Sequence, residues 1–82
     1  MMTSMERYVI AVKRDQRQTV KLSDALNRLS GVRGYTIVGD TQGVRTVIQA
    51  DDAAARRIKQ LLSDCCYVER EVLHALQAGS YR

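Results

Sequence analysis

The order of the hydrophobic periodicities constrains the fold of this chain most strongly. Four short runs are rich in β-branched and other apolar residues, and between them two stretches repeat apolar residues every three or four positions. Runs of the first kind indicate strands, and stretches of the second kind indicate amphipathic helices. The expected strands are 7–13, 35–38, 44–49 and 65–72, and the expected helices lie at 20–30 and 51–64.

This βαββαβ order predicts both helices on one face of a four-stranded antiparallel sheet, whose other face stays open. The predicted fold class is therefore α+β, a ferredoxin-like sandwich. The chain has 82 residues, which leaves room for one domain with one core. We expect an N-terminal extension at 1–6, a folded domain at 7–72 and a C-terminal tail at 73–82.

Particular residues are expected to begin and end these elements. Thr19 is the expected N-cap of the first helix. Gly31 is its expected stop, because glycine accepts the left-handed conformation that follows a last helical turn. Asp51 and Asp52 are expected to begin the second helix, where carboxylates accept from free N–H groups. Residues 39–43, Gly-Asp-Thr-Gln-Gly, indicate the turn of a hairpin.

The two cysteines and the single histidine do not suggest a metal or redox site. Cys65 and Cys66 are adjacent, and a disulfide between neighbours is strained. We expect them to act as small apolar residues, one on each face of the last strand. With His74 as the only histidine, no metal and no cofactor are predicted.

The motifs of common enzymes are also missing from the pattern. The sequence has no paired-carboxylate motif and no Cys-x-x-Cys. The glycines of 31–34 follow a predicted helix, whereas a phosphate-binding loop follows a strand. His74 has no arranged partner for nucleophilic catalysis. The sequence therefore predicts a binding protein, with no catalytic residues.

Charge and hydropathy bear on the partners. The net charge of +4 permits nucleic acid but does not demand it. An RNA-recognition sheet needs aromatic residues on its first and third strands, and only Tyr8 is present, so no nucleic acid is expected. No apolar run approaches the ~18 residues of a membrane span. The N-terminus lacks the pattern of a secretory signal, which predicts a cytoplasmic chain, secreted only if it is a fragment of a precursor.

Two segments carry a family resemblance. Residues 7–13 have the sequence Arg-Tyr-Val-Ile-Ala-Val-Lys, and residues 67–76 have the sequence Tyr-Val-Glu-Arg-Glu-Val-Leu-His-Ala-Leu. Together with the order of the elements, these segments resemble the propeptides of subtilisin-like serine proteases, over about residues 7–77. The resemblance implies an inhibitor, and in that family also a folding chaperone, of such a protease. Because no protease domain follows, the chain resembles the free-standing members that act in trans.

The resemblance also assigns binding residues. The open sheet face would lie on two surface helices of the protease, with Glu69 and Glu71 at the helix N-termini and Tyr67 beside them. Arg70 lies between the two carboxylates and is expected to point to the opposite face. The tail would lie in the substrate cleft as an added strand, like a cleaved product. Leu76 is favoured over Gln77 for the primary pocket. The tail residues assigned to binding are Leu73, His74, Ala75, Leu76 and Gln77.

Other interpretations stay open. Glu69 and Glu71 are also what an ordinary exposed strand carries for solubility. The βαββαβ order is shared with amino-acid-binding ACT domains, in which residues 31–34 would lie near the ligand. A third interpretation is an oligomerising or nucleic-acid-binding sheet. The ACT-like interpretation predicts a homodimer through edge strands or helices, and an open sheet face with exposed edges could pair with itself.

Overall fold

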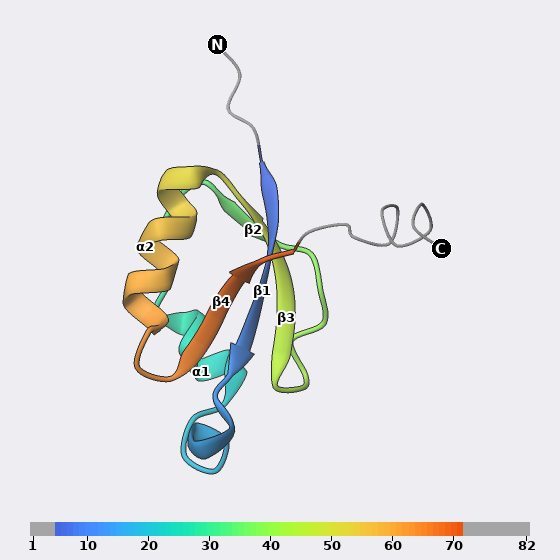
Figure 1. The fold of residues 1–82 in the computed structure, drawn as a ribbon, viewed down its shortest axis with the longest axis vertical. Coiled ribbons are helices and arrows are strands. Elements are labelled where there is room, and N and C mark those ends of the chain that lie inside the picture. The colour runs from blue at the N-terminus through green and yellow to red at the C-terminus, as the bar shows by residue number, and fades with distance from the viewer. Residues whose placement is uncertain (1–4, 72–82) are drawn as a thin grey trace, which may run out of the picture.

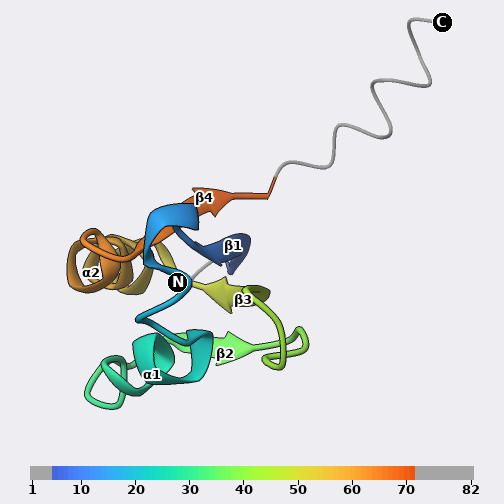
Figure 2. The ribbon, with the colours of Figure 1, turned by 90° about the horizontal axis from the view of Figure 1, so that it is seen from below.

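The computed structural model describes residues 5–71 (Figure 1). Its strands form one antiparallel sheet in the order β2-β3-β1-β4. Figure 2 shows both α-helices on the same side of the sheet, which confirms the ferredoxin-like α+β fold. The elements are β1 (Glu6–Val12), a 3-10 turn η1 (Arg14–Gln16), α1 (Leu22–Asn27), β2 (Tyr35–Ile37), β3 (Arg45–Ala50), α2 (Asp52–Leu62) and β4 (Cys66–Arg70).

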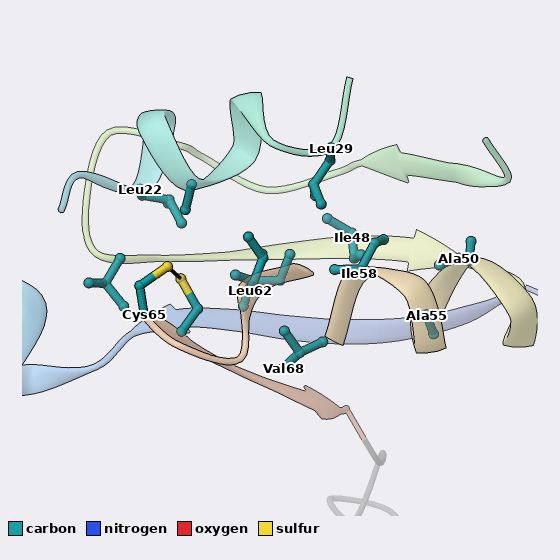
Figure 3. Close-up of a cluster of buried hydrophobic side chains, with 14 residues drawn as sticks. Leu22, Leu29, Ile48, Ala50, Ala55, Ile58, Leu62, Cys65 and Val68 are labelled. Carbon is teal, nitrogen blue, oxygen red and sulfur yellow. Dashed lines mark hydrogen bonds between the residues drawn. The ribbon is translucent and has the colours of Figure 1, made fainter. Parts of the chain in front are cut away.

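The core lies between the helices and one face of the sheet (Figure 3). Alternate residues of a strand point to opposite faces, so Ile10 of β1 points to the helices while its neighbours do not. Leu29 follows α1, and Ile58 and Leu62 come from α2; all three are fully buried with Ile48 of β3. Burying a side chain of this size contributes about 1.5–3 kcal/mol. This small set of aliphatic contacts fixes which face of the sheet lies against the helices.

The second helix begins as the sequence predicts. The Asp51 side chain accepts a hydrogen bond from the backbone N–H of Ala54 at 2.7 Å. The buried stripe is Ala54, Ala55, Ile58 and Leu62. Leu61 was expected in this stripe but is 37% exposed, because it lies at the solvent edge of the helix.

The first helix is shorter than expected, and its predicted N-cap is wrong. The helix has six residues, and Lys21 occupies the N-cap position without a side-chain hydrogen bond. The hydroxyl of Thr19 donates instead to the carbonyl of Gln16, 3.3 Å away, in the turn after η1. Threonine side chains compete with helix formation through such local hydrogen bonds. Val20 packs against the core from outside the helix.

The predicted role of Gly31 is also wrong, because Gly34, and not Gly31, is the one described glycine with a positive φ, at 92°.

The predicted placement of the cysteines is wrong as well. Cys65 lies in the turn before β4, so both cysteine side chains are buried in the core, with their Sγ atoms 3.6 Å apart. They do not take opposite faces of a strand, because only Cys66 belongs to one.

Candidate functional site

The side of the sheet that faces away from the helices is the candidate site, and we call it the open face. The connection between β2 and β3 lies on this side beside those two strands (Figure 2). Over β1 and β4, no other described segment covers it. The residues that alternate with the core on this face are Arg7, Val9 and Ala11 of β1, Thr36 of β2, Arg45, Val47 and Gln49 of β3, and Tyr67 and Glu69 of β4.

A shallow depression of about 300 Å³ lies in the middle of the open face. Its apolar floor is Val9 and Ala11 of β1. On the β4 side, Tyr67 stands opposite Ala11 and Glu69 opposite Val9. On the β3 side, Arg45 stands opposite Ala11. The face therefore presents an apolar centre with an aromatic ring and a carboxylate on one flank and a guanidinium on the other.

Tyr67 is the most exposed large apolar side chain among residues 5–71, at 57%. The Nζ atom of Lys13 lies 5.4 Å from the centroid of its ring. The same Nζ donates to the carbonyl of Ser63 at 2.9 Å. A cation over an exposed tyrosine ring contributes about 0.5–1 kcal/mol. Lys13 therefore holds the ring beside the depression while leaving its other face to solvent.

Glu69 presents a free carboxylate on this face. It is exposed, and within residues 5–71 its side chain makes no hydrogen bond and no ion pair. Alternation along β4 places it on the same face as Tyr67, as the sequence predicts. A hydrogen-bond donor at this point would meet an acceptor that no other residue of 5–71 uses.

Glu71, unlike Glu69, forms an ion pair with Arg7, which the sequence interpretation did not predict. Arg7 Nε donates to Glu71 Oε1 at 2.7 Å, and the two side chains are 48% and 31% exposed. The backbone N–H of Glu71 also donates to the carbonyl of Arg7 at 2.8 Å. The antiparallel register of β1 and β4 brings the two residues opposite each other. One of the two predicted carboxylates is therefore already partnered by a cation.

Arg70 points to the helix side of the sheet, where its Nη2 lies 3.0 Å from Glu6 Oε1. The prediction that it faces away from Glu69 is thus confirmed. Val9, Ala11 and Arg45 were given no role from the sequence, although the alternation of β1 and β3 places them on this face. Their contribution depends on the strand order β3-β1-β4, which brings β1 between the two flanks.

The rest of the predicted site lies outside the described residues 5–71: Leu73, His74, Ala75, Leu76 and Gln77. Their assignment stays a prediction. Of the eight predicted binding residues, the structure brings Tyr67 and Glu69 together on the open face and places Glu71 at its margin in the ion pair with Arg7.

Comparison with known proteins returned no match: no protein-family model, no curated protein and no solved structure proved significantly similar to this chain. Among residues 5–71, no group of three or more His, Cys, Asp and Glu side chains is placed to hold a metal ion. In the same part of the chain, no helix combines the length and the apolar character needed to cross a membrane.

Proposed function

We propose that this protein inhibits a subtilisin-like serine protease and binds it through the open face. One observation carries the proposal: a sheet surface presents an exposed aromatic ring, Tyr67, and a carboxylate, Glu69, around an apolar depression, and within residues 5–71 that carboxylate has no ion-pair partner. Interfaces between proteins commonly combine a central apolar area, an aromatic anchor and polar groups near the margin. The family resemblance of residues 7–77 supplies the class of partner.

Glu69 is the carboxylate that contributes most in this proposal. The first N–H groups of a helix have no partner within the helix, and its N-terminus carries a partial positive charge. A carboxylate there contributes up to ~2 kcal/mol when partly buried. Glu71 contributes less, because its charge is shared with Arg7 at 2.7 Å.

The tail completes the inhibitor in this proposal. Residues 73–77 begin three positions after the last residue of β4 and bind in the substrate cleft as an added strand. Main-chain hydrogen bonds provide affinity, and the side chain in the primary pocket provides selectivity, with Leu76 favoured over Gln77. A chaperone role follows from the same contacts, because a ligand that binds only the folded protease stabilises that state.

Titration of a subtilisin with purified variants tests the proposal. We expect the full chain to inhibit and Glu69→Gln to weaken inhibition about 5- to 30-fold, the equivalent of ~1–2 kcal/mol. Asp24→Asn is the matched control, since it removes one exposed carboxylate from α1 on the other side of the sheet. A chain ending at Glu71 tests the tail. Absence of inhibition by the full chain contradicts the function, and equal inhibition by the shortened chain contradicts the role of 73–77.

A further inference from the structure

The outer edge of β4 is a second surface, which adjoins the open face at Glu69. Among residues 5–71, β1 alone neighbours β4 in the sheet. At the ends of this pair, Lys13 N donates to Cys65 O at 2.9 Å and Glu71 N donates to Arg7 O at 2.8 Å. Residues of an antiparallel strand alternate between main-chain groups that face the neighbour and groups that face away. The N–H and C=O groups of Cys66, Val68 and Arg70 therefore face outward.

A groove of about 220 Å³ runs between this edge and α2 on the helix side of the sheet. α2 lies beside β4 (Figure 1). The apolar part of the groove is formed by Tyr8, Ala55 and Val68. The exposed main-chain groups of β4 thus border a hollow into which alternate side chains of an added strand would project.

The lining of this groove has one more basic side chain than acidic ones. Three of its lining side chains are basic: Arg56, Lys59 and Arg70. Two are acidic, Asp52 and Glu69. Asp52 lies 3.0 Å from Arg56 with both side chains 78% exposed, and Arg70 lies 3.0 Å from Glu6, which does not line the groove. Among residues 5–71, Lys59 has no ion pair. Arg56 and Lys59 also line the adjoining hollow along α2, so the basic row extends beyond the groove.

We propose that this edge binds an extended acidic segment of a partner protein as an added strand beside β4. The main-chain groups of Val68 and Arg70 provide the ladder, and alternate carboxylates of the segment meet Arg56, Lys59 and Arg70. Addition of a strand to a sheet edge is a general mode of peptide recognition, in which the backbone gives affinity and alternate side chains give selectivity. Here the selectivity is for negative charge.

The same charges disfavour a second copy of this chain at the edge. A symmetric pair places identical patches against each other. Antiparallel pairing of β4 with β4 would bring the two α2 helices to the same side of one continuous sheet, with Arg56 and Lys59 of one copy near those of the other. Like charges brought together across an interface oppose association. An acidic segment meets no such repulsion.

Two synthetic peptides on the full chain provide the test, observed by NMR. One is a capped hexapeptide that alternates valine and glutamate, and the other alternates valine and lysine. With the glutamate peptide we expect downfield shifts of the outward amide protons of Val68 and Arg70. The amides of Tyr67 and Glu69 should move less, because they are already bonded to β1. The lysine peptide should produce no such shifts.

Charge reversal separates this site from general attraction to a basic protein. The double variant Arg56→Glu/Lys59→Glu should bind the glutamate peptide about tenfold or more weakly, as expected from the loss of two surface ion pairs and the added repulsion. Arg57→Glu is the matched control, because it reverses an exposed charge of α2 that does not line the groove. Its affinity should stay within about twofold of the parent, as for a remote surface charge.

Three results overturn the proposal. The first is no shift at about 1 mM glutamate peptide, the range of a weak complex. The second is an equal response to both peptides, or equal losses in the Arg57 control. The third is a concentration-dependent shift of the Val68 and Arg70 amides without peptide, which would assign the edge to a second copy. None of these results depends on protease inhibition, so this proposal and the proposed function fail separately.

Discussion

The backbone N–H of Asp51 donates to the carbonyl of Gly34 at 3.0 Å, and the Asp51 carboxylate fills the space where a side chain on Gly34 would stand. A Cβ atom at Gly34 would lie 2.5 Å from Asp51 Oδ2. Because Asp51 also caps α2, this contact ties the start of β2 to the start of the helix. It accounts structurally for the second glycine of 31–34, without the ligand that an amino-acid-binding domain would place there.

Gly34→Ala should destabilise the fold by about 1–3 kcal/mol. Its φ of 92° is costly for a residue with a side chain, and the new methyl group would displace the Asp51 carboxylate. Urea unfolding followed by circular dichroism measures the loss. Gly31→Ala is the control, because nothing lies within 4 Å of its Cβ position and its φ is not positive. Equal losses in both variants would contradict this account.

Thr46→Val should stabilise the protein by about 1 kcal/mol. Thr46 is 3% exposed, and its Oγ1 has no hydrogen-bond partner in the described part of the chain. A buried polar atom without a partner costs its full desolvation, whereas valine has nearly the same shape and no hydroxyl. Thermal and urea unfolding measure the gain. A loss of stability would mean that the hydroxyl has a hydrogen-bond partner in solution.

The ion pair between Arg28 and Asp64 predicts part of the response to acid. Arg28 Nη1 donates to Asp64 Oδ1 at 2.8 Å, and this hydrogen bond lowers the pKa of the Asp64 carboxyl below its ordinary 3.8. A carboxyl with a lowered pKa stabilises the fold above its unfolded-state pKa, and this stabilisation disappears as the pH falls through its folded-state pKa. As the pH falls below about 4, the free energy of unfolding of Asp64→Asn should therefore decrease less than that of the parent, as measured by urea midpoints.

Arg28→Gln provides the check on that prediction. It should reproduce the flatter acid profile of Asp64→Asn, and the double variant should add little, because both substitutions remove the same contact. Additive effects on the profile would show that Asp64 responds to another group.

The buried cysteines should be unreactive in the folded protein. Burial raises the pKa of the Cys66 thiol, and the side chains of Cys65 and Cys66 are 1% and 3% exposed. Since the thiolate is the reactive form, iodoacetamide should label neither residue readily at neutral pH. Mass spectrometry should show slow labelling in buffer and rapid labelling in urea. Rapid labelling in buffer would indicate local opening of the turn before β4.

The sequence predicts those features that depend on strong local patterns. The α2 stripe and its Asp51 cap follow from apolar residues that repeat every three or four positions over an 11-residue helix, with two aspartates at its start. The six-residue α1 has too few turns to show its own ends, and the Thr19 hydroxyl is used by a nearby carbonyl. Cys65 could not be assigned to the core, because the pattern does not show that β4 begins one residue later.

The same distinction holds for the candidate site. Tyr67 and Glu69 share a face because strand residues alternate, which the sequence alone shows. The partner of Glu71 and the floor of the depression depend on strand order and register, which bring Arg7, Val9 and Ala11 beside β4. These long-range pairings join residues about 60 positions apart, and local patterns do not contain them.

Arg7→Gln tests the unequal roles of the two carboxylates. The substitution releases Glu71 from its 2.7 Å ion pair and leaves two free carboxylates on or beside the open face. If the proposed protease contact uses carboxylates at helix N-termini, inhibition should strengthen by up to about fivefold, since a surface ion pair of this kind is worth ~0.2–1 kcal/mol. The inhibition constant against a subtilisin is the measurement.

Arg28→Gln is the control for this change, because it releases Asp64 from a comparable exposed ion pair that lies just beyond the C-terminal ends of α1 and α2. It should leave inhibition unchanged, which would show that the gain from Arg7→Gln does not come from the lower net charge. In the double variant Arg7→Gln/Glu71→Gln the gain should disappear, because the released carboxylate is gone. A weaker inhibitor after Arg7→Gln would mean that the guanidinium itself contacts the partner, and would contradict the carboxylate role of Glu71.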